Sequence, residues 1–113
     1  MHEMSIAQNV VDIIREEMQK CNATVLKSVR LNVGEMSAIV PEAFSFCFEV
    51  ITDGTEIEGV ELIMDVIPLR GYCHKCENEF EIVDYAFTCP SCGDTNIDTI
   101  AGRDLSIVEM EVE

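Results

Sequence analysis

Four of the six cysteines in this 113-residue chain form two closely spaced pairs, in the sequences CHKC (Cys73 and Cys76) and CPSC (Cys89 and Cys92). A C-x-x-C turn directs two thiolates at one ion, and two such turns complete a tetrahedron. The intervening residues, 77–88, give the chain room to bring the second turn opposite the first. The spacing therefore predicts one metal ion held by these four cysteines.

Four thiolates leave no open coordination position, which is typical of structural zinc rather than catalytic zinc. A rubredoxin-like iron centre uses similar cysteine turns for electron transfer, and a tetrahedral thiolate set does not exclude iron. Disulfide bonds within each pair are a third alternative. The chain shows no secretory-signal pattern, so we expect a cytoplasmic protein, in which clustered thiols indicate metal chemistry rather than disulfides. We expect zinc.

The amino terminus is a second place where the residue types suit metal chemistry. The amine of Met1, the amide nitrogen of His2 and the imidazole of His2 can close two adjacent chelate rings with three nitrogens nearly in one plane. Such an array favours nickel(II) or copper(II) over zinc. Taken alone, however, these two residues favour the simpler interpretation of a solvated terminal histidine.

Two helices and three strands are expected to position these groups. Apolar residues at three- and four-residue spacing (Ile6, Val10, Ile13, Ile14 and Met18) predict an amphipathic helix over 5–20, with Ser5 as its cap and Asn22 as its stop. Proline in a first turn costs no helical hydrogen bond, so a second helix is predicted over 41–52. Alternating or apolar runs predict strands over 28–34, 59–68 and 105–113.

Residues 70–102 differ from this pattern because they contain all the paired cysteines and many turn residues. We therefore predict an α+β fold, with two helices packed on a small, mostly antiparallel or mixed three-stranded sheet, and an inserted four-cysteine, zinc-ribbon-like module. The domains are expected to be 1–69 plus 103–113, and 70–102, which would bind zinc. The other cysteines, Cys21 and Cys47, are expected to be small core residues.

Acidic residues outnumber basic ones by 22 to 7, which gives a net charge of −15. This charge disfavours nucleic acids and anionic membranes as partners and suits cations or basic surfaces. We find no Ser/His/Asp or Cys/His set, phosphate loop or glycine-rich nucleotide motif, so the chain is not expected to be an enzyme. A rubredoxin-type redox protein and a zinc-ribbon adaptor between proteins are the alternative functions.

The order of motifs resembles the HypA family of hydrogenase nickel-insertion accessory proteins. The resemblance rests on MHEMS at the start of a helix, then VRLNVGEMSAIVPEAFSFCFEVITDGTEIEGVEL, the two cysteine pairs and a closing LSIVEMEVE. It covers essentially the whole chain, and its specificity lies in the combination, since zinc knuckles alone occur in many unrelated proteins.

The resemblance implies that residues 1–69 plus 103–113 form a nickel-binding domain, in which His2 is the nickel ligand with Glu3 contributing nearby. It further implies that Cys73, Cys76, Cys89 and Cys92 bind zinc. It also implies transient Ni(II) and structural Zn(II), and delivery of nickel to the large subunit of [NiFe]-hydrogenase with a GTPase called HypB. Some family members also serve urease. Many members carry histidines beside the zinc cysteines. Here only His74 is available, and we expect it to be an exposed turn residue, the alternative being an auxiliary nickel ligand. The oligomeric state is expected to be a monomer or a weak dimer.

Overall fold

The computed structural model describes residues 3–113, which form two compact units. The first unit contains the chain up to Asn32, Ile39–Asp65 and Ser106–Glu113, and the second contains Val33–Ala38 and Val66–Leu105. The predicted assignment of nickel binding to one domain and zinc binding to the other stays a prediction. None of the helices within residues 3–113 combines the length and apolar character that crossing a bilayer requires.

Helix α1 (Glu3–Lys20) presents one apolar face to the core, formed by Ala7, Val10, Val11, Ile14 and Met18. The helix begins at Glu3, where a carboxylate suits the positive helix end. Ser5 therefore lies inside the helix, and its prediction as a cap is wrong. Ile13, expected on the apolar face, is exposed because that face centres on Val11 and Ile14 instead.

The end of α1 follows the prediction. Asn22 has a left-handed φ of 56°, and the amide of Ala23 donates to the carbonyl of Met18 at 2.9 Å. This is a Schellman arrangement, which satisfies helix carbonyls that would otherwise lack partners. Cys21 lies in this turn and is exposed, so the expectation that it belongs to the core is wrong.

Helix α2 (Pro41–Thr52) has the predicted bounds, with proline in its first turn. Its buried residues are Phe44, Phe48 and Thr52, and the two phenylalanine rings stack with centroids 6.2 Å apart. The Thr52 hydroxyl donates to the carbonyl of Phe48 at 2.9 Å, which pairs this buried polar group. Cys47 lies away from this buried face and is only partly buried.

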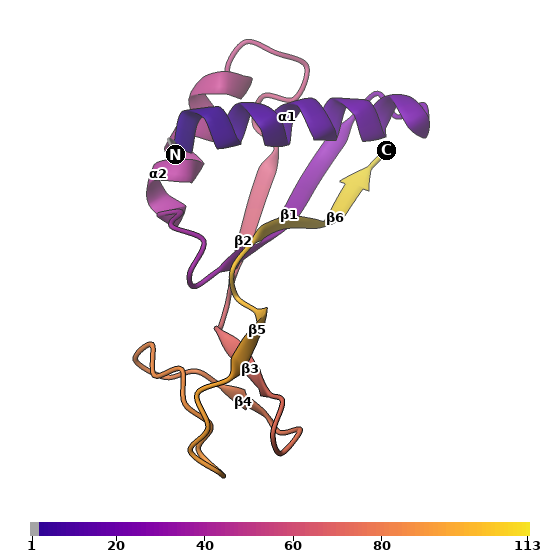
Figure 1. The fold of residues 1–113 in the computed structure, drawn as a ribbon. Helices are drawn as coiled ribbons and strands as arrows, with labels where there is room; N and C mark the ends of the chain where they lie inside the picture. The colour runs from indigo at the N-terminus through magenta and orange to yellow at the C-terminus, as the bar shows by residue number, and fades with distance from the viewer. Residues whose placement is uncertain (1–2) are drawn as a thin grey trace. The chain divides into compact units, whose positions relative to one another are not determined.

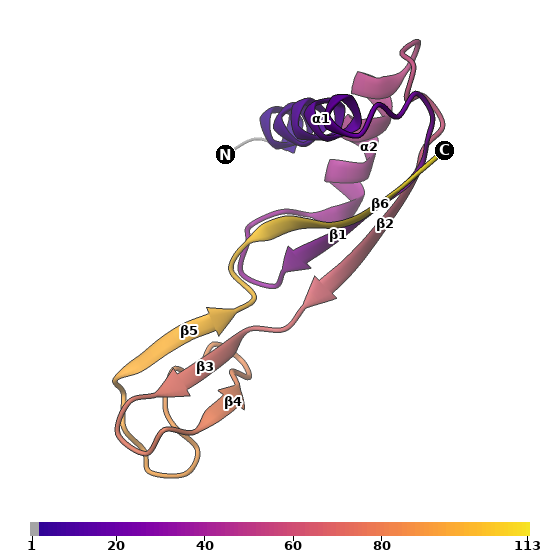
Figure 2. The ribbon, with the colours of Figure 1, turned by 90° about the vertical axis from the view of Figure 1, so that its right-hand side faces the viewer.

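The first sheet has the order β2-β1-β6, with β1 (Leu26–Gly34) between β2 (Glu61–Ile67) and β6 (Leu105–Val112). In Figure 2 the arrowheads of β1 and β2 point the same way and β6 runs in the opposite direction, so the sheet is mixed. Both helices lie on one face of it (Figures 1 and 2). Alternate residues of β1, namely Val29, Leu31 and Val33, are buried, as a sheet covered on one face requires. These observations confirm the predicted fold class.

The second unit contains its own three-stranded sheet, with β3 (Arg70–Cys73) between β4 (Glu79–Glu81) and β5 (Ile97–Ala101). Both pairings are antiparallel, and a register shift interrupts the β3–β5 pairing between Arg70 and Gly71. The core of this unit is small, consisting of Leu69, Cys73, Phe80, Ile82 and Cys89. Two of the four paired cysteines are therefore core residues.

Substitution of Leu31 by alanine tests the buried face of β1. Leu31 is fully buried, so the cavity is expected to lower the free energy of unfolding by about 2–5 kcal/mol. Urea unfolding followed by circular dichroism measures this change. The matched variant Asn32→Ala, whose side chain lies on the other face of the strand, should cost less than about 1 kcal/mol. Equal losses in the two variants would contradict the packing described here.

Candidate metal centre

The four predicted cysteines converge, and their sulfur atoms all lie within 4.8 Å of one another. Cys73 Sγ lies 3.6 Å from Cys92 Sγ, and Cys76 Sγ lies 3.5 Å from Cys89 Sγ. Tetrahedral ligands at a zinc–sulfur distance of about 2.3 Å stand about 3.8 Å apart, so the sulfur atoms match the size of such a site. All the cysteines are free thiols, which excludes the disulfide alternative from this structure.

The first cysteine turn is closed by backbone hydrogen bonds around Cys73. The amide of Glu77 donates to the carbonyl of Cys73 at 2.8 Å, and the amide of Cys73 donates to the carbonyl of Asn78 at 2.9 Å. In this closed turn Glu77 has a left-handed φ of 58°, which is unfavourable for a residue with a Cβ.

The second turn repeats the first. The amide of Gly93 donates to the carbonyl of Cys89 at 2.9 Å, and the amide of Cys89 donates to the carbonyl of Asp94 at 2.9 Å. Gly93 occupies the position of Glu77 and has a φ of 75°, which glycine adopts without strain. The two turns thus place their thiols by equivalent hydrogen bonds, but the backbone is strained at Glu77 and unstrained at Gly93.

Each turn contributes one buried and one exposed ligand. Cys73 and Cys89 are buried against the small core of the second unit, whereas Cys76 and Cys92 are exposed. The first cysteine of each pair is thus held by packing and the second by the turn alone. An ion at this site would be shielded from water on one side only.

The thiols differ strongly in acidity. Burial opposes ionisation of Cys89, but the backbone amides of Cys92 and Ser91 outweigh it and lower the pKa of this thiol to about 6. The hydrogen bond with the Cys89 thiol raises the pKa of Cys76 to about 12. Cys89 is therefore a readier thiolate than Cys76 at neutral pH, and an incoming metal must displace a proton from Cys76.

His74 lies inside the first turn but is not one of the four converging ligands. Its side chain is exposed, with Nε2 at 2.5 Å from Oδ2 of Asp98 and its ring edge-on to Tyr72. Within residues 3–113, the four cysteines are the only group of three or more His, Cys, Asp or Glu ligands close enough to share an ion.

The predicted nickel ligand, His2, lies outside the described residues, as does Met1. Glu3 is the first residue of α1 and is partly buried. The structure therefore brings together the predicted zinc ligands, and the role of His2 stays a prediction.

Sequence reasoning did not identify the second residue after each pair, Asn78 and Asp94, whose carbonyls close the turns. Their position in the sequence could have identified them, because Glu77-Asn78 and Gly93-Asp94 directly follow the two cysteine pairs. Gly93 in the second turn indicates a left-handed backbone. Glu77, at the same position of the first turn, gives no such indication from its residue type.

Replacement of Glu77 by glycine should stabilise the metal centre, because it relieves the left-handed strain of the first turn. The expected gain is about 1 kcal/mol. It can be measured as increased resistance of the zinc-loaded protein to urea or to a competing chelator. The reciprocal variant Gly93→Ala should lose stability by a similar amount. A destabilised Glu77→Gly protein would contradict the assignment of left-handed strain to Glu77.

Replacement of Cys89 by serine should abolish metal binding and disorder the β3–β5 sheet, since this thiol is both a ligand and a core residue. Metal analysis of the purified protein and the dispersion of the amide NMR signals measure the two effects. The control variant Cys47→Ser removes a thiol that lies outside the cluster and should retain one metal ion per chain. A folded, metal-loaded Cys89→Ser protein would contradict the assignment.

Comparisons with known proteins agree with this arrangement. A family model described as "Hydrogenase/urease nickel incorporation, metallochaperone, hypA" matches residues 1–112. The hydrogenase maturation factor HypA of Geobacter sulfurreducens is 43% identical over 113 residues, which are 100% of both chains. The factor of the same name from Trichodesmium erythraeum is 42% identical over 113 residues, covering 100% of this chain and 96% of the relative.

Among solved structures, the solution structure of the Ni metallochaperone HypA from Helicobacter pylori is similar, with a TM-score of 0.76. It is 21% identical, and the match covers 99% of this chain and 97% of that chain, so it supports the fold. Full-length matches to the family model and to relatives above 40% identity show more than the fold: the chain belongs to the HypA family of nickel-incorporation metallochaperones.

Proposed function

We propose that the protein is a cytoplasmic nickel carrier, not an enzyme, which delivers Ni(II) to the large subunit of a [NiFe]-hydrogenase together with a HypB-type GTPase. The observation that carries this proposal is the closed set of four thiolates in the second unit. A closed site suits a permanent ion rather than cargo that must be released. The cargo nickel therefore requires ligands elsewhere in the chain.

The four cysteines fit Zn(II) as the permanent ion. Their number, their sulfur chemistry and their tetrahedral spacing are those of structural zinc sites. When bound, zinc supplies a cross-link between the two cysteine turns. The chain's own contribution is to hold both turns closed through the backbone and to bury Cys73 and Cys89.

The proposed nickel ligands are the amine of Met1, the amide nitrogen and imidazole of His2 and, nearby, the carboxylate of Glu3. Nitrogen donors in a planar array favour nickel(II), for which a terminal site allows exchange because few packed groups must move. The names of the relatives support this role, because they describe hydrogenase maturation factors, and one solved structure is titled a Ni metallochaperone.

Nickel affinity should fall steeply below neutral pH. The terminal amine and His2 have ordinary pKa values of about 7.7–8 and about 6.5, and both must lose a proton to bind nickel. Affinity is therefore expected to be much weaker at about pH 6 than at about pH 8. A nickel titration against a competing chelator at the two pH values measures this, with zinc content determined in parallel.

The matched variants are His2→Ala, a short N-terminal extension that blocks the amine, and His74→Ala. The first two should lose nickel and keep one zinc ion, whereas His74→Ala should keep both metals. If the extended and His2→Ala proteins bind nickel like the parent at either pH, the amine–imidazole site is refuted. Loss of nickel in His74→Ala alone would then place the cargo in the cysteine module.

A further inference from the structure

The side of α2 that faces away from the core is apolar and exposed. Phe44, Phe48 and Thr52 form the buried side of this helix. On the opposite side, the side chain of Phe46 is 65% exposed, the largest fraction among the exposed large apolar side chains of residues 3–113, and Val50 is 49% exposed. The metal centre and the proposed nickel ligands use none of these residues.

The exposed apolar residues follow the spacing of a helix-packing face. Ala43, Phe46, Cys47 and Val50 stand at positions i, i+3, i+4 and i+7, which align on one side of a helix. Phe46 and Val50 are exposed, whereas Ala43 and Cys47 are partly buried. We call these four residues the α2 ridge. A ridge with this spacing is the form in which one helix accepts another across an interface.

Carboxylates line one side of the ridge. At 100° per residue, Glu42, Glu49 and Asp53 fall on a strip next to Phe46, on the side away from Cys47. All three residues are exposed. The ridge therefore has an aromatic centre, a small apolar side and an acidic side.

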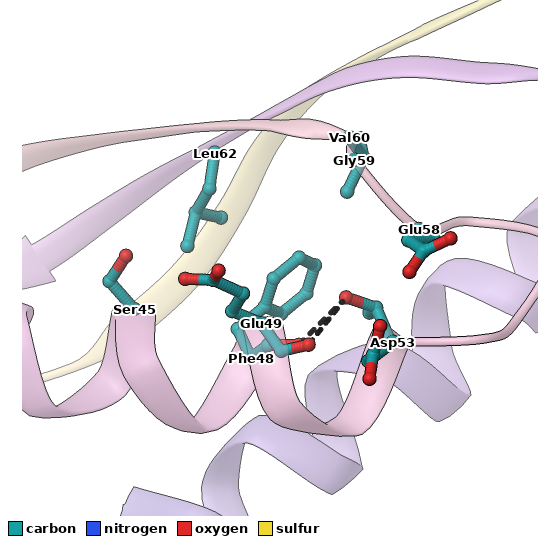
Figure 3. Close-up of a pocket in the computed structure, with 9 residues that line it drawn as sticks. Ser45, Phe48, Glu49, Asp53, Glu58, Gly59, Val60 and Leu62 are labelled. Carbon is teal, nitrogen blue, oxygen red and sulfur yellow. Dashed lines mark hydrogen bonds between the residues drawn. The ribbon is translucent and has the colours of Figure 1, made fainter.

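A pocket of about 340 Å³ opens beside this acidic strip, within the first unit. Figure 3 shows the carboxylate of Glu49 at one end and the side chains of Asp53 and Glu58 at the other. Phe48 and Leu62 give the pocket an apolar wall. Among the described residues that line it there are three carboxylates and no lysine or arginine, so its own charge is uncompensated.

We propose that the α2 ridge docks an amphipathic helix of a partner protein whose apolar stripe is flanked by lysine or arginine. The apolar stripe would cover Phe46 and Val50, and one basic side chain would enter the pocket between Glu49 and Glu58. Charge complementarity selects this occupant, because carboxylates line one side of the ridge and the adjoining pocket in a chain of net charge −15.

A second copy of this chain is the poorer occupant of the ridge. A two-fold contact through Phe46 would bring Glu42, Glu49 and Asp53 of one copy close to the same carboxylates of the other. Like charges across an interface disfavour association. A basic helix turns the same carboxylates into attractive partners.

Synthetic helical peptides test the proposal on the full-length, zinc-loaded protein. The probe is a peptide of about 15 residues with leucine at helical spacing and lysine or arginine on both flanks. One control peptide carries glutamate on the flanks, and the other keeps the basic flanks but has serine in place of leucine. Only the probe is expected to shift the amide NMR signals of residues 43–50 and 58–62.

Variants of the protein separate the contributions of the ridge and its rim. Phe46→Ala should weaken binding of the probe by at least about tenfold, as for an aromatic anchor at the centre of an interface. Glu49→Gln with Asp53→Asn should weaken binding and reduce its dependence on salt. Ile13→Ala, which removes a 47% exposed apolar side chain of α1, should bind like the parent. All these side chains are exposed, and an unchanged amide spectrum of each free variant confirms its fold.

Several results would overturn the proposal. Equal binding of the serine peptide would show that charge alone drives binding. Equal binding of the peptide with glutamate flanks would show that apolar contact alone drives it. Absence of probe binding, or shifts confined to other residues, would exclude the ridge as its site. Sedimentation showing that the protein dimerises alone, and that Phe46→Ala restores the monomer, would assign the ridge to a second copy of the chain.

Discussion

The second unit depends on the convergence of four thiolates. Its core contains three other buried apolar residues, Leu69, Phe80 and Ile82, and the remaining core positions are Cys73 and Cys89, which also belong to the metal centre. So small a core cannot offset the conformational entropy lost when about 40 residues become ordered. A bound ion would connect turns that come from different parts of the chain, so that strands as short as β3 and β4 would suffice to hold them.

The carrier role and the closed centre place opposite demands on metal ligands. A structural ion must stay bound through the lifetime of the fold, which suits four soft thiolate ligands that leave no open coordination position. Cargo must leave, so its ligands should be few, exchangeable and sensitive to competing donors. With cargo ligands at residues 1–3, as proposed, the four-cysteine site could bind its ion tightly without slowing the release of nickel.

Much of the fold could be predicted from local patterns, and the failures have identifiable causes. Pro41 fixes the start of α2, and the apolar spacing that follows gives its length, so its bounds were predicted correctly. Ser5 resembles a cap, but the helix continues to Glu3, so the local signal was misleading. Strands β3, β4 and β5 were not predicted individually, because residues such as Phe80 are single inward positions in segments too short to show alternation.

Of the metal centre, spacing predicted all four thiols. The strained backbone at Glu77 was not predictable, because nothing in its residue type indicates a left-handed conformation.

The four thiols are unevenly buried, so the metal centre has one side that faces the core and one side that faces solvent. Cys73 and Cys89 are fixed in the core, while Cys76 and Cys92 face solvent. A chelator or an oxidant approaching a bound ion would therefore meet the outer sulfurs of Cys76 and Cys92 first. The buried sulfurs of Cys73 and Cys89 would be the last ligands to dissociate. Cys73 and Cys89 would therefore keep hold of an ion through the core of the second unit while Cys76 and Cys92 exchange with solvent. An oxidant in solution would reach the same two outer sulfurs first, because exposure governs access to a thiol.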